Sequence, residues 1–451
     1  MINDFTQGNI PKQLITFAIP FMISNAMQVF YAMVDMIVVG RFVGSPGLSA
    51  VSIASQVFTF MTMLCLGFST GGQVYISQLI GSGQKERLNA TIGTMFSIIA
   101  ILGAVMTVLG LLLHRPVLNL LNTPAESFAM ATDYMIVCSC GILFTYGYNM
   151  ISAVLRGMGD SRHPFIFIMI ASGINIVLDL LFVGVFKWRV AGAALATILG
   201  QAFSFVYAMF YLYRRKTEFG FDFQRRSFAI RGDIAKILFR LGIPFALQSC
   251  AINISMMFVN SLVNQFGVAA SATFGVGVKL DDVINKITQG VTFAVSAMVG
   301  QNIASGNAGR AQQIVHVSWI ISLCSYAVAA CILWSFPEEL FSLFTDDQDV
   351  IALAFVFVSA ILWHFPAMAI MKGTNGFIQG IGNAGFSLAI ALLDGFVFRI
   401  VISYLLGVTF GLGLFGFFLG YGLAAYGTSI PGLIYFFSGM WKKRRLYTEK
   451  S

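Results

Sequence analysis

The chain has 451 residues, of which 57% are hydrophobic and only 10% charged, and its formal net charge is +8. A soluble domain carries about 25% charged residues, so this composition excludes an ordinary soluble protein and predicts a polytopic membrane protein. In a soluble chain the positive charge would suggest a nucleic-acid partner. Here Lys and Arg in the loops explain it, and no nucleic-acid partner is expected.

Twelve apolar stretches follow one another along the chain, each long enough to cross a bilayer as a helix, which takes about 20 residues. Their approximate limits are 13–39, 48–80, 91–113, 128–155, 164–186, 191–213, 234–263, 270–303, 311–335, 350–379, 384–408 and 413–440. The sequence therefore predicts an all-α membrane protein with twelve transmembrane helices. Pro20 lies inside the first of them, where proline removes a backbone hydrogen bond and makes a hinge available.

Lys and Arg are concentrated in the loops that follow the even-numbered helices and in the C-terminal tail. The richest segments are Arg214 to Arg231 and Lys442 to Arg445, whereas one loop on the opposite side is acidic from Glu338 to Asp349. Because positively charged loops stay in the cytoplasm, both termini are predicted to be cytoplasmic. We expect the protein in the plasma (inner) membrane.

The chain also repeats itself at a nearly constant spacing. SQLIGSGQKER and LRGMGD match GQNIASGNAGR and IQGIGN at an offset of 223 (300 − 77 and 378 − 155), and AIPF matches GIPF at 224 (242 − 18). Six helices per half is an even number, so both halves enter the membrane in the same sense. Such parallel repeats are typical of secondary transporters, which bind substrate between them. We therefore predict two six-helix lobes, 1–222 and 223–451.

Polar side chains interrupt the apolar stretches of the first half at similar depth. Asn175 and Asp179 are four residues apart and share a helix face. Asp179 precedes the loop at 187–189 by eight residues and Thr197 follows it by eight (187 − 179 and 197 − 189), so both reach a similar depth. Asp35 lies about six residues before Arg41, at the same end of the first helix.

A carboxylate at membrane depth costs roughly 2.5 to 3.5 kcal/mol, so Asp35 and Asp179 are expected to be functional. Together with the Asn175 amide and the Thr197 hydroxyl they form an all-oxygen set. Hard cations such as Na⁺ favour such sets. A proton needs only one carboxylate, and two neighbouring acids would favour its binding. The set therefore predicts a cation site for Na⁺ or H⁺, and the residues alone leave the ion open.

The whole chain resembles the multidrug and toxic compound extrusion (MATE) transporters. The resemblance rests on two sets of six helices, on Pro20 fifteen residues before Asp35, on the G-S-G-x-x-x-R loop after helix 2, on the R-G-x-G-D loop after helix 4 and on the polar set of helices 5 and 6. It implies drug or metabolite efflux driven by Na⁺ or H⁺, with the cation site in the N-terminal lobe. Through the family, Ala193 becomes a candidate ligand by its backbone carbonyl.

Other polar residues are candidates for a substrate cavity. In the first half these are Asn149 and the pair Asn25 and Gln28. Asn25, Gln28 and Asp35 follow one another at spacings of three and seven and so share a helix face. In helix 8, Lys279, Asp282 and Lys286 are spaced three and four apart. Local charge compensation between them is one interpretation, and a role of Lys279, Asp281 or Asp282 in lining the cavity is the other.

The remaining charged residues of the second half need partners. Asp394 and Arg399 are five apart and should diverge in angle on an α-helix, so partners from other helices are expected. Lys372 and His364 in helix 10 also need water or a partner. Some MATE branches carry a carboxylate in helix 7 or helix 10. This chain has none there, which argues against a C-terminal proton site of that type.

The sequence thus predicts a secondary antiporter that exports organic cations or drugs, with membrane lipid and the substrate as its partners. No cofactor besides the coupling ion and no obligate protein partner are expected. A flippase or exporter of a lipid-linked or anionic substrate is the alternative, and Lys279, Lys372 and Arg399 would give the cationic cavity that it requires. A membrane-embedded enzyme is disfavoured because the four histidines lack HExxH-like spacing.

Overall fold

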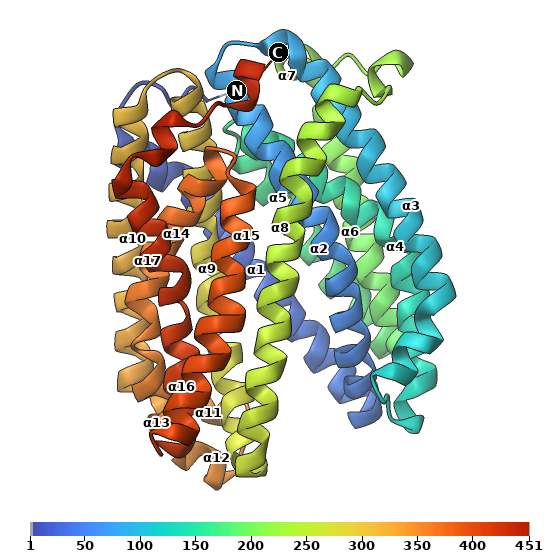
Figure 1. Ribbon diagram of the computed structural model, residues 1–451. Helices are drawn as coiled ribbons and strands as arrows, with labels where there is room; N and C mark the ends of the chain where they lie inside the picture. Colours follow the sequence, from blue (N-terminus) through green and yellow to red (C-terminus); the bar gives the residue numbers. More distant parts are fainter. Residues whose placement is uncertain (1–2, 451) are drawn as a thin grey trace. The chain divides into compact units, whose positions relative to one another are not determined.

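The computed structural model describes residues 3–450, and this part of the chain forms helices and no strands (Figure 1). Its contacts divide it into two compact units. Unit 1 contains Ile23–Ala246 with residues 3–4, and unit 2 contains Phe5–Met22 and the chain from Leu247 onwards. The predicted lobes, 1–222 and 223–451, were bounded at the linker between the two halves. Contacts instead divide the first helix of each half between the units.

Packing explains why these two helices are divided. Phe17 and Phe21, near the start of α1 (Ile10–Val43), belong to an aromatic and aliphatic core with Phe293 of unit 2. The start of α8 (Gly232–Val263) belongs to unit 1, where a Cβ on Gly67 would come within 2.6 Å of the α8 backbone at Gly242 and Ala246. Glycine at this position therefore permits a close helix–helix approach that any side chain would obstruct.

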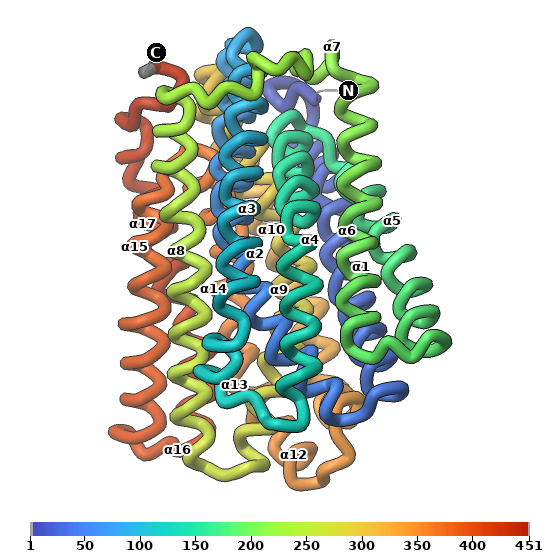
Figure 2. The backbone as a smooth tube through the Cα atoms, turned by 90° about the vertical axis from the view of Figure 1, so that its right-hand side faces the viewer, coloured from blue at the N-terminus to red at the C-terminus, as the bar shows by residue number. Residues whose placement is uncertain are grey.

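Unit 1 is built around α4, which lies against α2, α3 and α6, while α5 packs on α6 (Figure 2). Its helices after α1 are α2 (Ser45–Gly81), η1 (Lys85–Arg87), α3 (Leu88–Leu120), α4 (Ala125–Gly157), α5 (Arg162–Asp179), η2 (Leu180–Val185), α6 (Arg189–Arg214), α7 (Lys216–Phe219) and η3 (Arg225–Phe228). The last two lie in the basic linker between the halves.

Unit 2 is built around α14, which lies against α9, α10 and α17, while α16 packs on η5 and η6. Its helices after α8 are η4 (Asn264–Phe266), α9 (Val268–Ala304), α10 (Ala308–Ser335), α11 (Pro337–Ser342), α12 (Gln348–Ala352), α13 (Ala354–Ile361), α14 (His364–Gly380), α15 (Ala384–Leu392), η5 (Leu393–Ile402), η6 (Leu405–Thr409), α16 (Gly413–Ala424), α17 (Tyr426–Ser438), η7 (Met440–Lys443) and η8 (Tyr447–Lys450).

The helices agree with twelve membrane crossings. Ten spans of the described part are long and apolar enough to cross a bilayer, and α12 to α14 add an eleventh that is bent by 50°. The twelfth is α9, which has 37 residues but carries four charged side chains between Lys279 and Lys286. The prediction of an all-α membrane protein with twelve transmembrane helices is confirmed, although the stretch predicted at 350–379 is broken.

The repeat is visible in the backbone as well as in the sequence. Three pairs of glycines separated by 223 residues all have positive φ. The pairs are Gly44 (85°) with Gly267 (99°), Gly83 (75°) with Gly306 (83°), and Gly159 (83°) with Gly382 (74°). These φ values lie in the region that favours glycine, because a Cβ clashes there. The turns that connect equivalent helices are therefore built alike in both halves.

In the R-G-x-G-D loop, Asp160 fixes the start of α5. Its Oδ1 accepts hydrogen bonds from the backbone N–H groups of Arg162 and His163, and its Oδ2 accepts from His163 Nδ1 at 2.6 Å and from the Tyr211 hydroxyl at 3.2 Å. Burial raises the pKa of Asp160, but the hydrogen bonds and the charge of His163 outweigh burial, so the pKa lies below its ordinary value.

We expect Asp160→Asn to lower the thermal stability of the purified protein at neutral pH, because hydrogen bonds to a charged group contribute about 1.5–3 kcal/mol each. A carboxylate whose pKa is lowered by folding stabilises the protein above its unfolded pKa, and this contribution is lost as the pH falls through the folded pKa. The difference in Tm between the wild type and Asp160→Asn should therefore shrink in strong acid. A difference that stays constant with pH would contradict a role for the charge.

Candidate functional site

Three of the predicted cation-site residues are deeply buried in unit 1. The exposed fractions of Asp35 on α1, Asn175 on α5 and Asp179 on α5 are 8%, 3% and 0%. Thr197 on α6 is half-buried, and its hydroxyl accepts a hydrogen bond of 3.3 Å from Asn175 Nδ2. The structure thus brings α5 and α6 together at the predicted pair of polar residues.

Four buried oxygens at this place have no hydrogen-bond partner among the described residues. They are Oδ1 of Asp35, Oδ1 of Asn175 and both carboxylate oxygens of Asp179. The charge of Asp35 acts on Asp179, so the two carboxylates belong to one electrostatic environment. Buried acceptors without a donor are costly, and a proton or a cation would satisfy them.

Two tyrosines near these carboxylates were missed from the sequence. The negative charges of Asp35 and Asp179 act on the hydroxyl of Tyr31. The charge of Asp35 also acts on the hydroxyl of Tyr134 on α4. Tyr31 precedes Asp35 by four residues, so helix periodicity could have placed it on the same face. The position of Tyr134 depends on helix packing, for which the sequence carries no comparable signal.

The backbone changes its winding directly after Asp179. The α-helix α5 ends at this residue, and η2, from Leu180 to Val185, is a π-helix. Short π-helical segments occur often at functional sites, because they alter the direction of side chains within a continuous helix. Ala193, the ligand suggested by the family, is fully buried on α6, and a role for its carbonyl stays a prediction.

The chemistry available in unit 1 is that of oxygen ligands. The residues described by the structure contain no group of three or more His, Cys, Asp or Glu side chains that could hold a metal ion. Two carboxylates, one amide oxygen and one hydroxyl remain, which can bind a proton or a single hard cation. Asn25 and Gln28 on α1 are half-buried in the same unit, and Asn149 donates to the carbonyl of Thr145 on its own helix.

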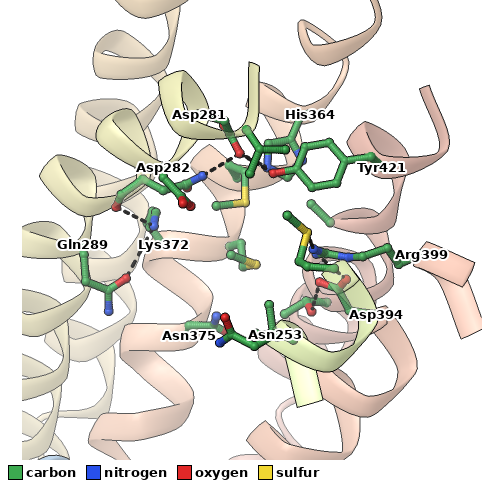
Figure 3. Close-up of a pocket in the computed structure, with 18 of the residues that line it drawn as sticks. Asn253, Asp281, Asp282, Gln289, His364, Lys372, Asn375, Asp394, Arg399 and Tyr421 are labelled. Atoms are coloured by element: carbon green, nitrogen blue, oxygen red, sulfur yellow. Dashed lines mark hydrogen bonds and ion pairs between the residues drawn. The ribbon is translucent and has the colours of Figure 1, made fainter. Parts of the chain in front are cut away.

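Unit 2 contains a cavity of about 480 Å³, lined from α8, α9, α14, η5, α16 and α17. Three methionines, Met256, Met368 and Met371, provide flexible apolar surface. Charged side chains of both signs face the same space (Figure 3). Of the three candidate residues of helix 8, Asp281 and Asp282 line this cavity, whereas Lys279 is exposed and lies outside the lining.

Asp281 joins three helices at one wall of the cavity. Its Oδ2 accepts hydrogen bonds from the Tyr421 hydroxyl at 2.7 Å and from Asn285 Nδ2 at 2.9 Å, and it lies 3.6 Å from Nε2 of His364. Nδ1 of His364 donates to the carbonyl of Gly422 at 2.9 Å. The partner that His364 was expected to need is therefore found on α9 and α16.

The expectation that Asp394 and Arg399 diverge in angle is wrong. Arg399 Nη2 donates to Asp394 Oδ1 at 3.0 Å, and the Thr428 hydroxyl donates to Asp394 Oδ2 at 2.9 Å. Both charged residues lie in η5, a π-helix, in which residues five apart are joined by backbone hydrogen bonds and share a face. The expected angle assumed α-helical winding.

Lys372 on α14 is only 4% exposed. Its ammonium donates to the backbone carbonyl of Asn285 at 3.2 Å and to Oε1 of Gln289 at 3.4 Å, both on α9 (Figure 3). Among the described residues no carboxylate lies within ion-pair distance of this ammonium. The sequence could not name these partners, because they lie 87 and 83 residues away.

The proposed hinge at Pro20 lies close to the point where α1 passes from unit 2 to unit 1, between Met22 and Ile23. The helix continues through the proline. Pro20→Ala restores a backbone N–H donor, so we expect normal membrane insertion but several-fold slower export. Initial export rates in proteoliposomes measure this, and Pro431→Ala, inside α17 and away from any division between the units, is the matched control. An unchanged rate would show that the proline is passive.

The chain has relatives among known transporters. The MatE family model matches residues 20–181 and 244–405, which are offset by 224 (244 − 20 and 405 − 181) in agreement with the predicted repeat. The chain is similar to "Probable multidrug resistance protein YpnP" of Bacillus subtilis, at 32% identity over 99% of both chains, and to "Probable multidrug resistance protein NorM" of Thermotoga maritima, at 26% identity over 98% of this chain and 95% of that one. Its fold matches the solved "Outward-facing conformation of a multidrug resistance MATE family transporter of the MOP superfamily" with a TM-score of 0.92, at 23% identity over 98% of each chain.

Proposed function

The chain belongs to the MatE family of multi-pass membrane transporters, and on that premise we propose that it is a secondary antiporter that exports organic cations or drugs in exchange for Na⁺ or H⁺. Both relatives are named "Probable multidrug resistance protein", which supports a drug-like substrate. We place the protein in the plasma membrane with both termini in the cytoplasm, on the basis of the Lys and Arg distribution.

One observation supports the coupling site above all others. Asp35, Asn175 and Asp179 present four buried oxygens that have no hydrogen-bond partner in the described structure. A membrane protein would gain nothing from two buried, interacting carboxylates unless a proton or a cation occupied the site during part of its cycle. Binding of the coupling ion at these oxygens is therefore the step that would drive export.

Transport in proteoliposomes tests this function directly. The purified full-length protein is reconstituted, Na⁺ and pH gradients are imposed separately, and export of a fluorescent organic cation is followed. We expect export that depends on one of the two gradients. Substrate movement that ignores both gradients would contradict the antiport mechanism.

An exporter of anionic or lipid-linked substrates is the second candidate. Lys372 and Arg399 in the unit 2 cavity favour it, since both are buried cations. Asp281, Asp282 and Asp394 line the same cavity and oppose a purely anionic ligand. Competition between an anionic and a cationic probe in the same proteoliposomes separates the two substrate classes.

A further inference from the structure

The cavity of unit 2 has a balanced set of charges. Three carboxylates, Asp281, Asp282 and Asp394, and three basic side chains, Lys286, Lys372 and Arg399, line it. A ligand with a single charge therefore meets no excess of the opposite sign. A ligand that carries both charges can gain from both kinds of side chain.

The charged side chains of this set differ in how many of their polar atoms have a hydrogen-bond or ion-pair partner within the protein. Asp394 and Arg399 form an ion pair at 3.0 Å, and Thr428 adds a hydrogen bond to Asp394, while Nε of Arg399 has no partner in the described structure. Lys372 has three N–H donors, of which two are used by neutral acceptors on α9. One N–H of a buried ammonium is thus left for an anionic partner.

Acceptors for a cation lie beside this ammonium. Asp282 is exposed beside Lys286, whose charge acts on it, and Oδ1 of the buried Asp281 is unpartnered in the described structure. Asn375, one turn beyond Lys372 on α14, faces the cavity with an amide that also lacks a hydrogen bond in the described structure (Figure 3). An amide can donate to a carboxylate and accept from an ammonium.

We propose that this cavity binds a small molecule that carries a carboxylate and an ammonium group together, and that such an amphoteric compound is the substrate class of the exporter. The carboxylate accepts from Lys372 and Asn375, and the ammonium donates to Asp281 and Asp282. Met256, Met368 and Met371 contact an apolar body. The volume of about 480 Å³ lies in the range of ligand pockets. The transport role of this site rests on the function proposed above.

A matched series of dipeptides tests the proposal on the full-length protein in lipid nanodiscs, by calorimetric titration. The probes are Phe-Phe, which carries both charges, its C-terminal amide, which carries only the ammonium, and its N-acetyl form, which carries only the carboxylate. We expect Phe-Phe to bind at least about tenfold more tightly than either derivative, since each loses hydrogen bonds to charged groups.

Two variants assign the ends of the ligand. Lys372→Met should reduce Phe-Phe affinity most of the way to that of the amide, since only Asn375 is left to donate to the carboxylate, and should leave amide binding unchanged. Asp282→Asn should weaken Phe-Phe and the amide but not the N-acetyl form. Lys279→Met, at an exposed lysine outside the cavity, is the control and should change nothing. If either variant fails to fold, the wild-type series still tests the proposal.

Equal affinity of Phe-Phe and one derivative for the wild type, or no binding of any probe, would overturn the proposal. Failure of the proposed function gives a different result. Gradient-driven export of an organic cation without a preference for Phe-Phe would leave the antiporter and remove this inference. A preference for Phe-Phe without gradient-driven export would support the amphoteric ligand and contradict the antiporter.

Discussion

Asp179→Asn should abolish gradient-coupled export while leaving a folded protein in the membrane. Asp179 is fully buried, both of its carboxylate oxygens lack a hydrogen-bond partner in the described structure, and the charge of Asp35 acts on it. An amide has nearly the same shape but cannot bind a proton or carry the charge that attracts a cation. We expect coupled export to fall to the level of empty liposomes.

Asp35→Asn should have the same effect, because Asp35 supplies one of the buried, unpartnered oxygens of the site and the charge that acts on Asp179. Gel filtration and thermal stability of both variants are the folding controls. Asp133→Asn on α4, which is exposed, is the matched acidic control and should export at the wild-type rate. Wild-type coupling in a folded Asp35→Asn or Asp179→Asn variant would remove that residue from the mechanism.

The parts of the unit 1 site that could be predicted from the sequence are those formed by residues close to one another along the chain. Asn175 and Asp179 lie on one helix face because they are four residues apart, and counting from the loop placed Thr197 on the next helix at the right depth for its hydrogen bond with Asn175. The coupling of Asp35 with Asp179 joins residues 144 apart (179 − 35). Depth in the membrane predicted their proximity, since both lie near the same ends of their helices.

The cavity of unit 2 could be predicted only in part. Helix 8 supplied Asp281 and Asp282 as candidates, but the contacts of Asp281 with His364 and Tyr421 arise only through the packing of α9, α14 and α16. The ion pair of Asp394 and Arg399 depends on π-helical winding, which apolar periodicity does not reveal. Helix number and the repeat follow from hydropathy and spacing, whereas breaks and local changes of winding depend on tertiary contacts.

Asn175→Ala and Thr197→Ala should separate Na⁺ coupling from H⁺ coupling. A Na⁺ ion would be held by the Asn175 amide oxygen and the Thr197 hydroxyl in addition to the carboxylates, so each substitution would delete a ligand. If Na⁺ is the coupling ion, as the all-oxygen set slightly favours, Na⁺-dependent export at fixed pH should fall severely in both variants. Export rates as a function of Na⁺ concentration measure this loss.

A proton leads to the opposite expectation for the same two variants. One carboxylate suffices to bind it, so Asn175→Ala and Thr197→Ala would retain pH-driven export with a shifted pH dependence, while Asp179→Asn would not. Asn119→Ala is the matched control, because Asn119 is exposed on α3 in unit 1 and belongs to neither candidate site. Wild-type export that ignores Na⁺ but follows the pH gradient would contradict the Na⁺ assignment. The buried oxygens of Asp35 and Asp179 would then serve as the proton site, and the hydrogen bond between Asn175 and Thr197 would serve to orient them.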